Sequence, residues 1–217
     1  GQTDLSIDWR HADHSSAHLA PDPKTYQDAV IQAYVARAYH ARGAFAVHTW
    51  IATKPKNAEQ YTVYQVVGWN LYRNLPALSI KQDIPDRAWY SQKPILLVDI
   101  RGTKAETLIP KIQKAAEDYP YPSQYTTWPG PNSNSFTAYI GRQIPELGLL
   151  IPTTAIGKDF LVPQRFFART PSGTGYQLSL YGLFGIAIGK KEGLELSFLA
   201  LVIGIDPLRL GIMLPGV

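Results

Sequence analysis

The sequence contains no cysteine. This absence excludes disulfide bonds, zinc sites with cysteine ligands and a thiol nucleophile in the chain as it stands. The sequence also lacks an apolar run of the roughly 18 to 20 residues that a membrane-spanning helix needs. Its most apolar stretch, residues 194–205, is shorter and is interrupted by Glu195.

No signal peptide is recognisable, and the chain starts with Gly1 instead of methionine. We interpret this start as a cloning residue followed by a natural chain that begins upstream of Gln2. The removed part would be a signal peptide or an anchor, which would place the protein close to a membrane. Together with the absent cysteine and the polar start, this predicts a periplasmic or cell-envelope protein.

The chain has little concentrated charge, although its net charge is +4 and its pI is about 9.2. The basic residues are scattered, and the longest basic run is Lys190-Lys191. Nucleic acid is therefore not an expected partner. Hydrophobic residues make up 45% of the 217 residues, which is enough for a sizeable core. We predict a single domain over residues 1–217, with residues 1–25 as a polar N-terminal arm.

The N-terminal arm carries the histidines His11, His14 and His18. Their spacing is not that of a helical zinc pair with a defined third ligand. The sequence therefore predicts no metal site here, and it indicates no cofactor.

Three segments near the start favour β-strands. Residues 29–38 fit either a helix, through their alanines, or a strand, through their alternation. Residues 44–53 and 61–69 are rich in β-branched and aromatic residues, which are typical of strands. We expect 29–38 and 44–53 to form a hairpin and all three segments to form an antiparallel meander. The continuous apolar run 95–100 predicts a further strand, central in its sheet.

Later segments predict two helices and a hairpin. Residues 103–118 have a candidate cap at Thr103, a glutamate three residues later, and an apolar stripe that Pro110 interrupts. Residues 175–207 contain two apolar stretches joined by a charged glycine turn at 190–193, which predicts an apolar C-terminal hairpin. The remaining stretches, 70–93 and 148–172, are expected to be irregular.

The second helix follows a distinctive loop, Trp128-Pro129-Gly130-Pro131, and the residues after it suit a helix start. Asn132, Ser133 and Asn134 are all good N-cap residues. A helix start offers unpaired N–H groups and a partial positive charge, where many enzymes hold a nucleophile. The alternative interpretation is a well-capped helix without chemistry.

His48 is the basic group best placed to serve such a nucleophile. It lies inside the expected strand 44–53, between apolar neighbours. A buried histidine is more often structural than catalytic, so both interpretations stay open.

This order of elements, with a histidine strand before Asn132-Ser133-Asn134-Ser135-Phe136, resembles circularly permuted papain-like proteins. The resemblance is to NlpC-type peptidases, PPPDE peptidases and lecithin:retinol acyltransferase-like proteins, some of which carry an Asn-Cys-x-x-Phe motif. It implies an α+β fold in which an antiparallel sheet packs on helices. It further implies a hydrolase or acyltransferase acting on peptide, amide or ester bonds, with Ser133 at the cysteine position and His48 as base. Gln65 or Tyr64, on the next expected strand, corresponds to the third polar residue of those families, and Gln65 is the candidate to orient the histidine ring.

The chain also resembles an uncharacterised bacterial family, domain of unknown function 3750, which has no known activity. The resemblance rests on pieces spread over most of the chain: 45–50, 66–69, 128–136, 154–160, 172–177 and 204–207.

The chemistry of a serine differs from that of a cysteine at this position. A helix N-terminus contributes up to about 2 kcal/mol, which helps to ionise a thiol but falls far short for a hydroxyl. Ser133 would need His48 in direct contact as general base. Three interpretations remain: a working Ser–His dyad, an engineered exchange of cysteine for serine, or a binding protein that has lost its nucleophile. A purely structural role for both residues is also open.

The binding interpretation uses the same predicted cleft for a peptide, a glycan or a lipid headgroup. Its candidate residues are the polar and aromatic side chains near the motif: Asn132, Asn134, Trp50, Tyr64 and Trp128. The partner of either interpretation is an unknown small molecule, peptide or envelope substrate.

Overall fold

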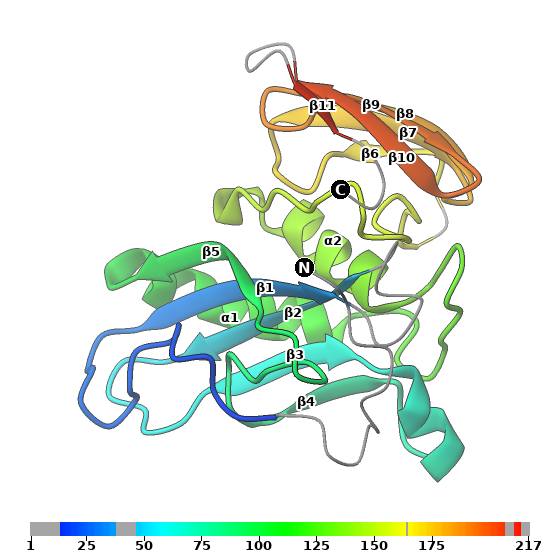
Figure 1. Cartoon of the computed structure of the whole chain (residues 1–217). Coiled ribbons are helices and arrows are strands. Elements are labelled where there is room, and N and C mark those ends of the chain that lie inside the picture. The colour runs from blue at the N-terminus through cyan, green and yellow to red at the C-terminus, as the bar shows by residue number, and fades with distance from the viewer. Residues whose placement is uncertain (1–13, 38–46, 164, 207–210, 214–217) are drawn as a thin grey trace.

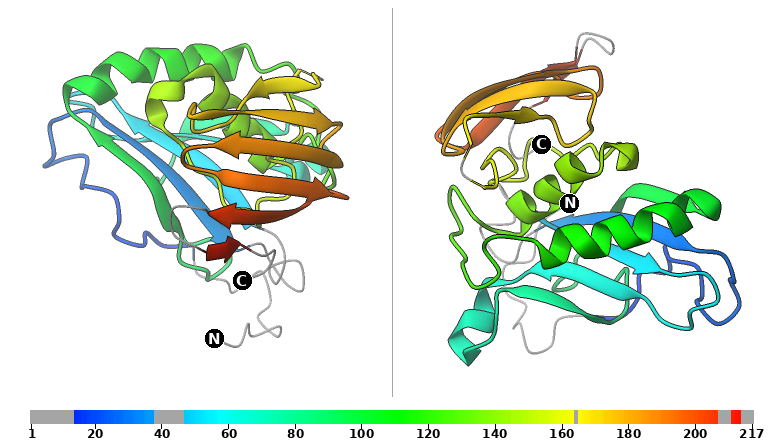
Figure 2. Two further views of the ribbon diagram at one scale, coloured as in Figure 1. Left: turned by 90° about the horizontal axis from the view of Figure 1, so that it is seen from above. Right: turned by 180° about the vertical axis from the view of Figure 1, so that it is seen from behind.

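The computed structural model describes residues 14–37, 47–163, 165–206 and 211–213. They form three layers: a five-stranded sheet, two α-helices on one of its faces, and a six-stranded sheet on the far side of the second helix (Figure 1). The view from behind shows the same sequence of layers (Figure 2). The predicted α+β class, with antiparallel sheet packed on helices, is confirmed.

The first sheet has the strand order β4-β3-β2-β1-β5, and all its pairs are antiparallel. Its strands are β1 (Val30–Arg37), β2 (Val47–Lys54), β3 (Thr62–Val66), β4 (Leu78–Gln82) and β5 (Ile95–Arg101). The expected hairpin of β1 and β2 and the meander of β1 to β3 are confirmed. The β-branched and aromatic residues of these strands fill both faces of the sheet, so they favour strand over helix.

Three expectations for this sheet need correction. β5 is an edge strand and not a central one; its first residue, Ile95, is 67% exposed. β3 ends at Val66, and a 3-10 helix (Gly68–Arg73) takes the place of its expected end. β4 lies in a stretch expected to be irregular. Residues 44–46 of the expected second strand lie outside the described residues.

The two helices cover one face of the first sheet. α1 (Thr103–Glu117) contains Pro110, and α2 (Ser133–Gln143) is followed by a 3-10 turn (Pro145–Leu147). The predicted stripe of Leu108, Ile112, Ala115 and Ala116 is buried, and Ala105 and Ile109 are buried with it. Thr103 is the first helical residue and not the cap, because the N-cap position is taken by Gly102 at φ 67°.

The second sheet is an antiparallel meander in the order β11-β10-β9-β8-β7-β6. Its strands are β6 (Phe167–Arg169), β7 (Gly175–Leu180), β8 (Phe184–Gly189), β9 (Gly193–Phe198), β10 (Leu201–Asp206) and β11 (Gly211–Met213).

The predicted hairpin over residues 175–207 is therefore wrong in its number of strands. The charged turn between β8 and β9 lies where it was expected, but each arm folds back once more. The first extra turn has Tyr181 at φ 54° and Gly182 at φ 75°, and the second has Leu199 at φ 50° and Ala200 at φ 60°. Two-residue turns with positive φ join tight hairpins, and their usual sequence signal is Asn-Gly or Gly-Gly. Leu199-Ala200 gives no such signal.

The described part of the N-terminal arm is also not free in solvent. Residues 16–28 run along the outer face of the first sheet, and Ser16 forms a β-bridge with Arg87. The Asp86 carboxylate accepts hydrogen bonds from Ser16 Oγ (2.7 Å) and from the backbone N–H groups of Leu19 (2.6 Å) and Ala20 (3.0 Å). These bonds tie the arm to the loop that follows β4.

Candidate functional site

The start of α2 is fixed by a complete capping box. The Asn132 Oδ1 accepts from the backbone N–H groups of Asn134 (3.0 Å) and Ser135 (3.1 Å), and Ser135 Oγ accepts from the Asn132 N–H (2.8 Å). The Asn132 Nδ2 donates to the carbonyls of Thr127 (3.1 Å) and Ile156 (3.2 Å). The side chain thus uses both donors and both acceptor positions inside the protein.

Asn134 joins three segments in the same way. Its Oδ1 accepts from Thr49 Oγ1 (3.0 Å), and its Nδ2 donates to the carbonyls of Val47 (2.9 Å) and Ile156 (2.8 Å). It therefore connects β2, α2 and the loop before β6. The two asparagines predicted to bind a ligand have their amide groups occupied by these internal bonds.

Ser133 is the first residue of α2 and is 4% exposed. Its expected place at a helix N-terminus is confirmed. Its carbonyl accepts a hydrogen bond from Thr49 Oγ1 at 3.3 Å, so this end of the helix rests on β2.

His48 pairs with Gln65, as the sequence predicts. The His48 Nε2 lies 3.0 Å from the Gln65 Oε1. Because a carbonyl oxygen only accepts, this contact requires the proton on Nε2 and leaves Nδ1 as the unprotonated nitrogen. The ring stacks on Trp89, with centroids 3.8 Å apart and planes 12° apart.

The surroundings of His48 make it a weak base. The side chain is 6% exposed, and burial lowers its pKa to about 4, although the bond to Gln65 opposes this shift. The imidazole is therefore neutral near pH 7. A general base works best when its pKa lies near the working pH, so this histidine is poorly tuned for removing a proton from a hydroxyl.

Ser133 and His48 lie on opposite faces of the first sheet. Successive side chains of a strand alternate between its faces. Val47 and Thr49 face the helices, because Val47 packs on the core that includes both helices and Thr49 bonds to α2. His48 faces the other way, toward Trp50 and Trp89.

The structure therefore does not bring the predicted dyad together. In the part of the chain that the structure describes, no hydrogen bond links the Ser133 hydroxyl to the His48 ring. A serine nucleophile requires that contact, either directly or through one water.

The other predicted residues are also dispersed. Trp50 stacks on Tyr34 at 5.4 Å and donates to the Pro85 carbonyl at 2.7 Å, which places it in the outer core with His48. Tyr64 lies in the core under the helices, 3% exposed, and its pKa is raised by burial. Trp128 is 48% exposed and donates to the Leu199 carbonyl at the turn after β9.

A second polar centre, which the sequence did not reveal, is buried between α2 and the second sheet. Lys158 Nζ lies 3.0 Å from Asp159 Oδ1 and 2.5 Å from Glu195 Oε2. Arg142 Nη2 donates to the Lys158 carbonyl (2.7 Å) and to Gln177 Oε1 (2.8 Å). The only sequence signal was the piece Lys158-Asp159, which resembled the uncharacterised family but had no assigned role.

For two members of this centre, the neighbouring opposite charges shift the pKa more than burial does, so the charged form is favoured. Burial opposes the charge of Lys158, yet Asp159 and Glu195 raise its pKa. Burial also favours the neutral form of Asp159, yet Lys158 and Arg142 hold its pKa below the ordinary value. For Glu195 the balance differs, because burial raises its pKa. The contacts of this centre suit a structural role.

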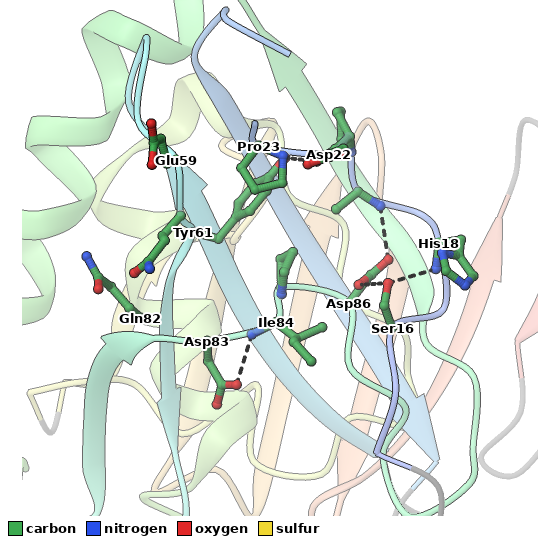
Figure 3. A pocket seen from close by; sticks show the side chains of 14 residues that line it. Ser16, His18, Asp22, Pro23, Glu59, Tyr61, Gln82, Asp83, Ile84 and Asp86 are labelled. Carbon is green, nitrogen blue, oxygen red and sulfur yellow. Dashed lines mark hydrogen bonds between the residues drawn. The ribbon is translucent and has the colours of Figure 1, made fainter. Parts of the chain in front are cut away.

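A sizeable cavity lies elsewhere, between the N-terminal segment and the loops at one edge of the first sheet (Figure 3). It has a volume of about 600 Å³. Its polar lining consists mainly of Ser16, His18, Asp22, Glu59, Gln82, Asp83 and Asp86. Among the residues that the structure describes, no lysine or arginine lines it, so its described lining is acidic although the protein as a whole is basic.

The four carboxylates of the pocket differ in their bonding. Asp83 forms ion pairs with Lys81 (3.0 Å) and Arg87, and Asp86 accepts the three bonds that hold the N-terminal segment. Within the described ranges, neither Asp22 nor Glu59 forms a salt bridge. These two groups lie toward the same end of the pocket in Figure 3.

The prediction that the N-terminal arm holds no metal concerns three histidines, of which His11 lies outside the described residues. His14 contacts the Tyr90 ring edge-on at 5.4 Å, and His18 lines the pocket. Over the ranges that the structure describes, no group of three or more His, Asp or Glu side chains is arranged to hold a metal ion. Within the same ranges no helix is both long and apolar enough to cross a membrane.

The fold and the contacts above define an α+β protein with two antiparallel sheets around a capped central helix. A family model described as protein of unknown function (DUF3750) matches residues 28–160, which is more than half of the chain. The chain belongs to this family. The match covers the first sheet and both α-helices but ends before β6, so the pieces 172–177 and 204–207 lie beyond it.

No curated protein and no solved structure matches the chain. The resemblance to papain-like proteins therefore stays a prediction.

Proposed function

We propose that this chain is a ligand-binding protein and not a serine hydrolase, and that its ligand bears an amine or guanidinium group. A lysine- or arginine-containing peptide segment is the ligand class that fits best. The observation that carries the proposal is the pocket of about 600 Å³ in which Asp22 and Glu59 lack a cationic partner among the described residues.

The pocket has the size and position of a ligand site. Protein sites for small ligands usually have volumes of about 300 to 1,000 Å³. Its walls are held by internal bonds: Tyr61 OH donates to the Pro21 carbonyl at 3.0 Å, and Asp86 holds the N-terminal segment. A glycan suits it less well, because its one aromatic lining residue, Tyr61, is only 2% exposed and offers no ring face for stacking.

A calorimetric titration with a capped Gly-Arg-Gly peptide, compared with Gly-Glu-Gly, tests the proposal. We expect the arginine peptide to bind and the glutamate peptide not to bind. Replacing both carboxylates by amides, D22N with E59Q, should weaken binding by roughly 5- to 10-fold, since each partly exposed charge pair contributes up to about 1 kcal/mol.

The matched control is E106Q on the exposed side of α1, which removes one carboxylate far from the pocket. It should leave binding unchanged. Equal binding of the two peptides, or arginine-peptide binding that survives the double amide variant, would contradict the proposal.

A further inference from the structure

The second sheet has its apolar side chains on its outer face. In β7, Tyr176, Leu178 and Leu180 are each about half exposed, whereas Gln177 and Ser179 between them are buried. The same alternation continues through β8, β9 and β10, so that the exposed set also contains Phe184, Ile186, Ile188, Leu196, Phe198, Leu201, Ile203 and Ile205. We refer to these eleven residues as the outer apolar face.

The register makes this face continuous. Leu178 pairs with Ile186, Ile186 pairs with Leu196, and Leu196 pairs with Ile203. Paired residues of neighbouring strands point to the same side and lie in contact distance. Soluble monomers rarely expose a contiguous apolar surface of this extent, and such surfaces mark interaction sites.

The inner face explains why the sheet is oriented this way. Gln177 Nε2 donates to Asp159 Oδ1 (3.2 Å), Ser197 Oγ donates to Asp159 Oδ2 (3.1 Å), and Glu195 pairs with Lys158. These polar side chains must face the buried charges, so period-2 alternation sends the apolar side chains outward. The outward apolar face is thus built into the strands and does not arise from one exceptional residue.

The exposed charged side chains that the structure describes between residues 160 and 205 are all basic. Between residues 160 and 205, the described acidic side chains, Glu192 and Glu195, are both buried. The basic side chains Arg165, Arg169, Lys190 and Lys191 are exposed. Arg169 pairs with Tyr176 across β6 and β7, so it borders the apolar face directly.

We propose that the outer apolar face docks flat on a lipid bilayer that contains anionic headgroups. An apolar surface flanked by exposed basic side chains complements such a bilayer both in polarity and in charge. Aromatic side chains at its border, Tyr176, Tyr181 and Trp128, are of the type that settles at the membrane–water boundary. A second copy of this chain is a poorer occupant, because face-to-face packing would bring two cationic margins together.

Vesicle flotation tests this proposal with the full chain. The protein should float with vesicles of phosphatidylcholine mixed with phosphatidylglycerol, and less with phosphatidylcholine alone or at high salt. The triple variant I186T/L196T/I203T should lose flotation. The triple variant R165Q/R169Q/K190Q should bind the mixed vesicles at least about ten-fold more weakly, because each basic residue near an anionic surface contributes to binding.

The matched control is L75T/I80T/I95T, which changes exposed apolar residues outside the second sheet. It should float like the parent chain. Circular dichroism of each variant establishes that it is folded. Flotation that survives I186T/L196T/I203T would overturn the proposal. Absence of flotation, together with a concentration-dependent dimer that the same triple variant abolishes, would also overturn it and assign the face to self-association.

Discussion

The two sheets of this protein bury opposite kinds of surface. The first sheet is apolar on both faces: Ile31, Ile51 and Val66 pack under the helices, and Tyr34, Trp50 and Val63 pack under the N-terminal segment and the loop after β4. The second sheet buries glutamine, serine and glutamate together with the smaller apolar side chains of Ala187 and Val202, and it exposes leucine, isoleucine and phenylalanine. Only the first sheet therefore stabilises the fold in the usual way, through burial of its large apolar side chains.

This difference between the two sheets shows which interactions stabilise each of them. The second sheet is attached to α2 through the ionic centre of Lys158, Asp159, Glu195 and Arg142 and through close backbone approach. A Cβ on Gly141 of α2, for instance, would lie 2.7 Å from the Pro171 carbonyl. Such an attachment depends on complete pairing, because a buried charge that loses its partner is costly. The variants below separate the two modes of stabilisation.

The largest effect is expected from Lys158→Met. The change leaves the buried carboxylates of Asp159 and Glu195 without their cation, so the free energy of unfolding should fall by about 3 to 5 kcal/mol. Urea titration followed by tryptophan fluorescence measures it. Lys114→Met, which breaks an exposed pair with Asp118, is the control and should give no measurable change. Equal stability of the two variants would show that the ionic centre does not hold the second sheet.

A matched pair of isoleucines tests the two faces. Ile51→Ala removes a side chain that is 1% exposed in the first sheet, and it should cost about 2 to 5 kcal/mol. Ile186→Ala removes one that is 38% exposed on the outer apolar face, and it should cost less than about 1 kcal/mol. Chemical denaturation of both variants gives the comparison. Similar losses would mean that the outer face is buried within the folded chain.

The pH dependence of stability should report the buried His48. Its pKa is about 4 when folded, against roughly 6.5 when unfolded. As the pH falls below 6.5, His48 becomes protonated in the unfolded chain while it stays neutral in the folded chain. Stability should therefore decrease between pH 6.5 and 4, by about 3 kcal/mol from this group.

The variant His48→Gln keeps a donor for Gln65 but cannot titrate. Its unfolding free energy should be less dependent on pH over that interval than that of the parent chain. A parent profile that is flat from pH 6.5 to 4 would contradict a buried, neutral His48.

The smallest effect is expected from Ser133→Cys. Because the chain has no other cysteine, the new thiol is the sole target of a thiol-reactive probe. Without a histidine in contact, it should react no faster than a thiol placed at the exposed Ser123 and should alter stability by less than about 1 kcal/mol. Faster labelling than the Ser123→Cys variant, at neutral pH, would restore the Ser–His interpretation.

The sequence was informative where local chemistry decides the structure. Alternation and β-branched residues predicted β1 to β3, and cap-type residues after a Pro-Gly-Pro loop predicted the start of α2. The pairing of His48 with Gln65 was also expected, through the resemblance to papain-like proteins, and the two residues lie on neighbouring strands. These features depend on contacts between residues that are close in the chain or in adjacent strands.

The site itself was not predictable from element order. Whether His48 meets Ser133 depends on which face of β2 the histidine occupies, and a shift of one residue reverses that face. The pocket is assembled from three distant segments around Asp22, Glu59 and Asp83, so no single motif marks it. The number of strands in the second sheet was underestimated because a turn such as Leu199-Ala200 carries no Asn-Gly or Gly-Gly signal.

The measurement that tests the contrast between the sheets most directly is the unfolding free energy of I186T/L196T/I203T. Threonine is β-branched, so it preserves the strand while removing the outward apolar surface. If these side chains contribute nothing to folding, the variant should stay within about 1 kcal/mol of the parent chain and be more soluble. A loss of more than about 4 kcal/mol, typical of buried positions, would show that the face belongs to the core.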